Sequence, residues 1–157
     1  MPRGKKILKN IITGNMDAEI AIVCGKNKKL FSQAKKLKYK YDCNRLKVYG
    51  YIDFIYSLIN ISDVVVTKCG ASTFMEVLLI GKVPVINNYI WEQEKGNMEY
   101  VCKGDMGILE KKPGLLPGVI HRLLTDSELY NSFSINIRNA SIRNGVGQVS
   151  DYILNFQ

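Results

Sequence analysis

The sequence predicts an α/β fold in which about five strands form a parallel sheet with helices on both faces. Short apolar runs alternate along the chain with helical stripes, at the spacing of successive strand–helix units. The apolar runs show no period-two alternation of polar and apolar residues, which is typical of strands covered on both faces. Glycine and asparagine separate many of the segments, as turn residues do.

The expected elements follow from these patterns in chain order. Continuous apolar runs predict strands over residues 19–24, 46–50, 83–87 and 106–109, and one more from Asp63 up to a turn at Gly70. Apolar stripes with helical spacing predict helices over residues 5–13, 28–41, 54–60, 71–80, 91–102, 115–124, 128–140 and 148–156.

The composition indicates one cytoplasmic domain over residues 1–157. Apolar residues make up 46% of the chain, and no apolar run approaches the roughly 20 residues that span a bilayer. The basic N-terminus runs into an amphipathic segment, where a signal peptide would have an apolar core. The four cysteines show no CxxC spacing, and Cys24 lies inside an apolar run, so we expect buried thiols in place of disulfides.

Positive charge is concentrated in the first third of the chain. Residues 1–48 hold 13 Lys and Arg against 3 Asp and Glu, a net +10, while residues 49–157 hold 9 against 11, a net −2. We favour the interpretation that this charge comes from lysines on the solvent-exposed faces of two helices and has no binding role. An anionic membrane lipid on the inner face of the membrane stays open as a partner. Nucleic acid is not expected, because aromatic residues are not interleaved with the basic ones.

The stretch from Asp63 to Glu76 is the strongest candidate for a binding site. A strand, a turn at Gly70 and a helix that begins near Ala71 leave free backbone N–H groups at the positive end of a helix dipole. Such a helix start is suited to a phosphate, and Glu76 follows Ser72 by about one helical turn. An ordinary strand–helix turn with Ser or Thr capping would show the same pattern.

Two more loops are expected at the carboxyl ends of the strands, where open sheets of this class bind ligands. The loop at residues 50–53 has extended backbone that could contact a base edge, although the residues alone favour a plain loop. The helix start at residues 89–97 carries polar side chains suited to sugar hydroxyls, although acids also stabilise a helix N-terminus on their own.

No catalytic group or metal site is predicted. The single histidine, His121, falls within a helical stripe and is interpreted as a helix-surface or semi-buried residue, and no nucleophile motif is present. The residues alone therefore indicate a nucleotide-binding half that lacks its own chemistry.

Two segments carry a resemblance to a known family. These are "SDVVVTKCGASTFMEVLLIGKVPVI" and "NNYIWEQEKGNMEYV". They resemble the C-terminal, donor-binding domain of MurG-like GT-B glycosyltransferases, with the greatest similarity to the diacylglycerol glycosyltransferase and monogalactosyldiacylglycerol synthase branch. The resemblance implies a Rossmann-like half of a GT-B fold that takes part in hexosyl transfer from a UDP-sugar to a membrane lipid such as diacylglycerol.

The resemblance also implies roles for particular residues. Backbone at Ile52 would read uracil, and Glu76 would accept hydrogen bonds from the ribose hydroxyls. No cofactor or metal is implied, because helix N-termini and basic groups offset the charge of the leaving UDP. The pyrophosphate would be held by Gly70, Ala71 and Ser72, with the Thr73 hydroxyl in support, and the donor sugar would face Gln93, Glu94 and Asn97.

The resemblance further implies that two parts of the family's enzymes are missing. The family's donor domain begins with a strand before the helix at Lys5, and that strand is central in its sheet. The N-terminal acceptor domain, which is expected to hold the catalytic base, has no counterpart either. We therefore expect a fragment that is inactive alone. A subunit that completes a two-protein transferase and a UDP-N-acetylglucosamine 2-epimerase-like domain are the alternatives.

Overall fold

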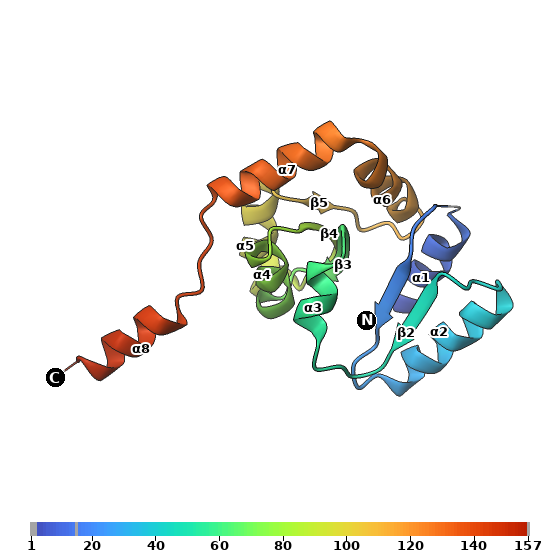
Figure 1. Cartoon of the computed structure of the whole chain (residues 1–157), viewed down its shortest axis with the longest axis horizontal. Coiled ribbons are helices and arrows are strands. Elements are labelled where there is room, and N and C mark those ends of the chain that lie inside the picture. Colours follow the sequence, from blue (N-terminus) through green and yellow to red (C-terminus); the bar gives the residue numbers. More distant parts are fainter. Residues whose placement is uncertain (1–2, 15, 157) are drawn as a thin grey trace.

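The structure is a computed structural model that describes residues 3–14 and 16–156, and Figure 1 shows its elements. Strands and helices alternate, as predicted. The strands are β1 (Ile20–Val23), β2 (Leu46–Tyr49), β3 (Val64–Lys68), β4 (Val83–Asn88) and β5 (Ile108–Leu109). The helices are α1 (Gly4–Thr13), α2 (Lys28–Lys40), α3 (Ile55–Asn60), α4 (Ala71–Leu79), α5 (Trp91–Lys103), α6 (Leu116–Thr125), α7 (Ser127–Asn139) and α8 (Val146–Leu154).

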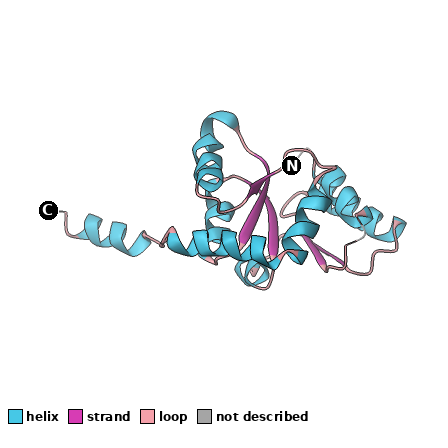
Figure 2. Cartoon of the chain, turned by 90° about the horizontal axis from the view of Figure 1, so that it is seen from above, coloured by secondary structure: helices cyan, strands magenta, loops and turns pink. Residues whose placement is uncertain are grey.

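The five strands are parallel but are divided between two small sheets. One sheet has the order β1-β2 and the other has the order β3-β4-β5. All three strand pairs are parallel, and Figure 2 shows the two groups of strands apart from each other. The prediction of about five parallel strands with surrounding helices is confirmed. Among the described residues, no strand of one sheet is hydrogen-bonded to a strand of the other, and β1 and β3 lie on either side of the break (Figure 1).

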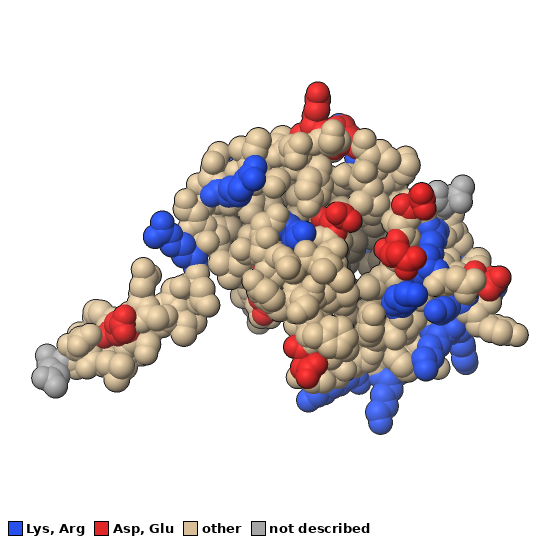
Figure 3. Space-filling model, viewed as in Figure 1, with Lys and Arg blue, Asp and Glu red and all other residues tan. Residues whose placement is uncertain are grey.

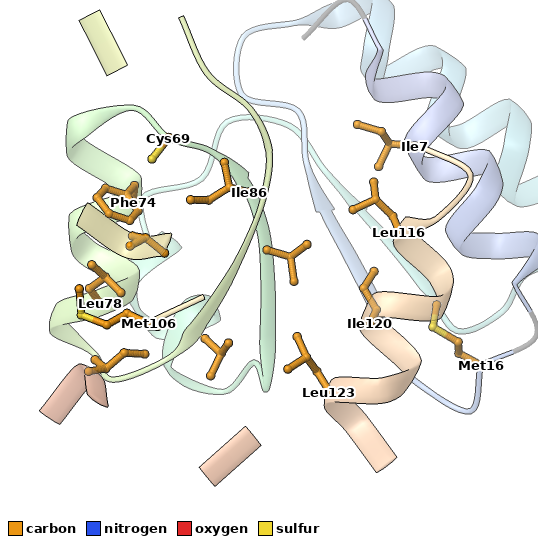
Figure 4. Packing of buried hydrophobic residues seen from close by; sticks show 14 residues of the cluster. Ile7, Met16, Cys69, Phe74, Leu78, Ile86, Met106, Leu116, Ile120 and Leu123 are labelled. Atoms are coloured by element: carbon orange, nitrogen blue, oxygen red, sulfur yellow. The ribbon is translucent and has the colours of Figure 1, made fainter. Parts of the chain in front are cut away.

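Each sheet has its own buried core. The larger core packs α4, α5, α6 and α7 around β3 and β4, and the smaller core packs α1 and α2 against β1 and β2. Helix α6 connects the two halves, because it contacts both β3 and α1. Figure 4 shows Leu116, Ile120 and Leu123 along one side of α6, with Ile7 of α1 close to Leu116. The two sheets are therefore held together by helices.

The strands differ in how completely they are covered. The side chains of β4 are buried from Val83 to Asn87, as expected for a strand with a neighbour on each side. In contrast, Val64, Val65 and Val66 of β3 are only half-buried, and Ala21 of β1 is exposed. Apolar residues are therefore partly open to water where the sheet is interrupted.

The cysteines behave as predicted. All four are free thiols; Cys24, Cys43 and Cys69 are buried and Cys102 is half-buried. Burial raises the pKa of the Cys69 thiol to about 11, with smaller contributions from Glu94 and Cys102. A thiol with this pKa stays protonated at neutral pH and acts as a small apolar core residue.

The last helix, α8, projects away from the rest of the chain (Figure 1). It buries none of its residues, and its exposed apolar side chains include Val149, Tyr152, Ile153 and Leu154. In the described part of the chain, no helix combines the length and apolar character needed to cross a membrane.

Candidate functional site

The loop between β3 and α4 places an open helix N-terminus at the carboxyl end of β3. The Cys69 N–H donates to the Asn88 carbonyl at 3.0 Å, which fixes the loop beside the end of β4. Gly70 is the N-cap, and the Phe74 N–H donates to its carbonyl at 3.3 Å. No side chain caps α4, and no acid lies in its first turn. Its first amides are therefore available to an anion.

The side chains of this helix start are arranged as a ligand site would need. Ser72 and Thr73 are exposed, and neither hydroxyl caps the helix, so the alternative of a Ser/Thr-capped turn is wrong. Glu76 lies four residues beyond Ser72 on the same side of α4 and is half-buried. None of the ion pairs between described residues involves Glu76. Its carboxylate therefore forms no ion pair with a cation among residues 3–14 and 16–156.

An ion pair between a half-exposed lysine and a buried carboxylate lies directly against the Gly70 turn. The Lys68 Nζ donates to the Glu94 Oε1 at 2.8 Å, and Glu94 is only 6% exposed. A Cβ at Gly70 would lie 3.0 Å from the Lys68 Nζ and 3.2 Å from the Glu94 Oε1. The backbone of Gly70 has φ −76° and ψ 139°, which any residue adopts. A larger residue here would therefore have to displace the ends of the Lys68 and Glu94 side chains.

Two side chains of α5 fasten the second helix start to the first. The other carboxylate oxygen of Glu94, Oε2, accepts from the Ile90 N–H at 2.9 Å, and the Asn97 Nδ2 donates to the Cys69 carbonyl at 3.2 Å. Gln93, in contrast, is exposed. Of the three residues predicted to face the donor sugar, Glu94 and Asn97 thus hold the two loops together in this structure.

The structure brings most of the predicted site residues together, with one exception. Gly70, Ala71, Ser72 and Thr73 lie beside the Gln93–Asn97 segment through the contacts just described. Ile52 is the exception. It is half-buried and lies on the loop that follows β2, and β2 belongs to the two-stranded sheet, not to the sheet that contains β3. That loop is anchored to β1, because the Gly25 N–H donates to the Gly50 carbonyl at 3.1 Å.

Lys68 is a site residue that the sequence reasoning missed. It ends β3, where the register shifts so that Thr67 faces Ile86 but Lys68 faces Asn88. Such bulges re-aim a side chain and are common near functional sites. The sequence shows a basic residue just before Cys69-Gly70. The direction in which the Lys68 side chain points, however, depends on the bulge and on the position of α5.

The pH dependence of stability tests the Lys68–Glu94 pair. The Lys68 hydrogen bond lowers the pKa of Glu94, and the Ile90 N–H adds to this, while desolvation opposes it. Because the pKa is lower in the folded state, the pair stabilises the fold above the ordinary carboxyl range near pH 4.5. We expect this stability to be lost as the pH falls through the lowered pKa.

Thermal unfolding measured between pH 3 and pH 7 checks this expectation. A Glu94→Gln variant removes the titrating group, so its melting temperature should fall less steeply toward low pH than that of the wild type. Asp151→Asn, on the projecting helix α8, is a control that should keep the wild-type slope, because α8 buries none of its residues. Equal slopes for wild type and Glu94→Gln would contradict a contribution from the pair.

Comparison with known proteins identifies the family. Residues 3–100 match the glycosyltransferase family 28 C-terminal domain, so the match covers more than half of the chain. The chain belongs to this family. All nine predicted site residues, from Ile52 to Asn97, fall inside the matched part of this glycosyltransferase family 28 C-terminal domain.

The relatives are enzymes of glycolipid synthesis by name. The chain is 33% identical over 100 residues to monogalactosyldiacylglycerol synthase 1 of Arabidopsis thaliana, covering 64% of this chain and 18% of the relative. It is 28% identical over 109 residues to a probable monogalactosyldiacylglycerol synthase of Nicotiana tabacum, covering 69% and 20%. It is 28% identical over 141 residues to the processive diacylglycerol beta-glucosyltransferase of Bacillus licheniformis, covering 89% and 36%. The chain thus corresponds to a minor part of each relative.

Solved structures with the same fold are chains about twice as long. The Anabaena protein Alr3699/HepE, solved in complex with UDP and glucose, superposes with a TM-score of 0.72 at 18% identity, over 98% of this chain and 45% of that chain. WaaG, a glycosyltransferase involved in lipopolysaccharide biosynthesis, superposes with a TM-score of 0.65 at 14% identity, over 98% and 43%. Because nearly the whole chain superposes at once, both small sheets keep the relative positions that they have in these folds.

Proposed function

We propose that this domain is the donor-nucleotide half of a glycosyltransferase that transfers a hexose from a UDP-sugar to a membrane lipid such as diacylglycerol. The observation that carries the proposal is the open N-terminus of α4, with Glu76 one turn further on and the start of α5 beside it. The amides suit a pyrophosphate, and the carboxylate suits ribose hydroxyls. The solved complex of the Anabaena protein with UDP supports this ligand class.

The catalytic groups for hexosyl transfer are proposed to lie outside this domain. Groups of this domain offer binding and positive charge from helix amides and Lys68, and the proposal requires no metal at the donor site. The base that activates the acceptor is proposed to lie in an acceptor domain or partner subunit, in keeping with relatives that are three to five times as long as the part matched here. The relatives named above are synthases and transferases, which favours transfer over epimerisation.

An anionic lipid surface is the second proposed partner. Helices α1 and α2 contain nine lysines and no acidic residue, and the two helices pack against each other. Figure 3 shows Lys and Arg side chains gathered over this side of the molecule. Juxtaposed lysines are attracted to anionic lipid headgroups, and the relatives are named for reactions of diacylglycerol. This surface would place the domain peripherally on a membrane.

Titration with UDP tests the proposed function. We expect UDP to bind this chain saturably. The binding is measured from chemical-shift changes in NMR spectra, and these changes should cluster at the starts of α4 and α5. Cytidine diphosphate is the matched control, because it offers the same diphosphate and ribose with a different base. A chain that shows no change with millimolar UDP would contradict the proposal.

The interruption between β1 and β3 is proposed to take one more parallel strand in the complete protein. The half-exposed valines of β3 and the exposed Ala21 of β1 mark the uncovered edges. On β1, the N–H groups of Ile20 and Cys24 donate to the β2 side at 2.9 Å each. Successive N–H groups along a strand point to opposite edges. The N–H groups of Ala21 and Val23 therefore point away from β2. An unpaired edge of this kind is a template for another strand.

Hydrogen exchange tests the additional strand. The Ala21 and Val23 amides should exchange at least about tenfold faster than the Ile22 amide in this chain. Fusing a designed apolar strand ahead of Arg3 should protect Ala21 and Val23 and raise the melting temperature. A fusion that carries proline at alternate strand positions is the control and should do neither, because proline removes the donors. Equal exchange in both fusions would contradict the additional strand.

A further inference from the structure

The proposed function gives Lys68, the cation at the β3–α4 turn, only a general share in the positive charge of the site. Lys68 ends β3, and its ammonium group lies against Gly70, whose carbonyl accepts the first hydrogen bond of α4. The amides of that helix are the proposed cradle for the diphosphate. Lys68 therefore sits at the cradle without being part of its backbone.

Other lysines near the two loops are turned toward aromatic rings. The Lys95 Nζ lies 4.8 Å from the ring centre of Trp91, and the Lys111 Nζ lies 4.0 Å from that of Tyr89. Lys95 also lies 3.5 Å from the Glu99 carboxylate, on the outer side of α5. The carboxylate partner of Lys68 is Glu94, and the Lys68 side chain is 50% exposed. The side chain of Lys68 is thus half open to solvent, while that of Glu94 is only 8% exposed.

The charges around this ammonium group favour an anionic ligand. The first turn of α5 carries Glu92 and Glu94, so a diphosphate beside it would meet two carboxylates. Lys68 neutralises Glu94 at a distance of 2.8 Å, and a diphosphate carries more negative charge than one carboxylate. A flexible lysine is the side chain that can move between two anions, because its charge is compact and its stem has several rotatable bonds.

Resting on the proposed function, we propose that Lys68 binds the diphosphate of the donor and that Glu94 competes with the diphosphate for the same ammonium group. Binding then draws Lys68 away from Glu94. The released carboxylate keeps its hydrogen bond from the Ile90 N–H and gains free capacity at Oε1. Oε1 is thereby available to a hydroxyl of the donor sugar only after the diphosphate has bound.

Affinities for UDP and uridine, measured by NMR titration, test this competition. Lys68→Met should weaken UDP binding by about tenfold or more and change uridine binding by less than about twofold, because uridine has no phosphate. Lys68→Arg should restore most of the preference for UDP. Glu94→Gln should strengthen UDP binding by about two- to threefold, because the competing charge is gone. Lys103→Met, in the last turn of α5, removes the same charge at the far end of the helix and should leave both affinities unchanged.

The outcomes separate this inference from the proposed function. A wild-type chain that binds neither UDP nor uridine contradicts the proposed function itself. A wild-type chain that binds UDP, with the same ratio of UDP to uridine affinity in Lys68→Met, contradicts only the assignment of Lys68. A purely structural ion pair would make Lys68→Met and Glu94→Gln lose affinity for both ligands alike. Opposite changes in UDP affinity for the two variants are expected only from competition.

Discussion

Replacing Glu76 by alanine should weaken UDP binding by about 10- to 100-fold, because a carboxylate that accepts two ribose hydroxyls contributes charge-assisted hydrogen bonds of about 1.5–3 kcal/mol. The position of Glu76 on α4, half-buried and outside the ion pairs of the described residues, leaves its oxygens to a ligand. Affinities should be measured for UDP, uridine and inorganic pyrophosphate by the same titration.

The three ligands locate the loss within the nucleotide. UDP and uridine should weaken by a similar factor in Glu76→Ala, since both contain the ribose, while pyrophosphate binding should change by less than about twofold. Asp151→Ala removes a carboxylate from the projecting helix α8 and is the control that should leave all three affinities unchanged. If Glu76→Ala bound UDP as tightly as the wild type, the ribose assignment would fail.

Replacing Gly107 by alanine should destabilise the fold by about 3 kcal/mol, the upper part of the range for overpacked cores. Gly107 is buried, and a Cβ there would lie 2.6 Å from the Pro84 carbonyl oxygen, 2.8 Å from the Pro84 Cγ and 3.0 Å from the Val101 Cγ1. Because the nearest atom belongs to the backbone of β4, a side-chain rotation cannot relieve the contact. The strand itself must move.

Thermal unfolding gives the size of this effect. For a chain of this length, about 3 kcal/mol corresponds to a fall in melting temperature of about 6–12 °C. Gly118→Ala, within α6, is the matched control: no heavy atom lies within 4 Å of its new Cβ. Since alanine is the better helix former, this control should gain about 0.5–1 kcal/mol. Similar melting temperatures for the two variants would contradict a close approach at Gly107.

The elements were largely predictable from the sequence, because their signals are local. Alternating apolar runs and helical stripes placed all five strands and all eight helices within a few residues of their observed positions. The fifth strand is shorter than predicted, over Ile108–Leu109 and not residues 106–109. The two residues ahead of the observed strand lie against the core. Met106 is buried there, and the backbone of Gly107 lies so close to Pro84 that a Cβ would not fit.

The site was less predictable, because its contacts join distant segments. The helix start at Gly70 follows from a local pattern, but the Lys68–Glu94 pair depends on how β3 and α5 meet across 26 positions of sequence. Glu94 and Asn97 were predicted to face a sugar, and no pattern in the sequence indicated that they also hold two loops together through Lys68 and the Cys69 carbonyl. The division into two sheets depends on hydrogen bonds between strands, which apolar periodicity does not specify.

The projecting position of α8 affects the free energy of binding for any partner that contacts this helix. Isolated helices shorter than about 12–15 residues are marginal in water, and α8 has nine residues and buries none of them. Its helical form therefore has little support from the body of the domain. A partner that covers Val149 and Tyr152 would have to supply the free energy of helix–coil ordering as well as that of binding. Affinity at this end of the chain is thus set partly by the unbound state of α8.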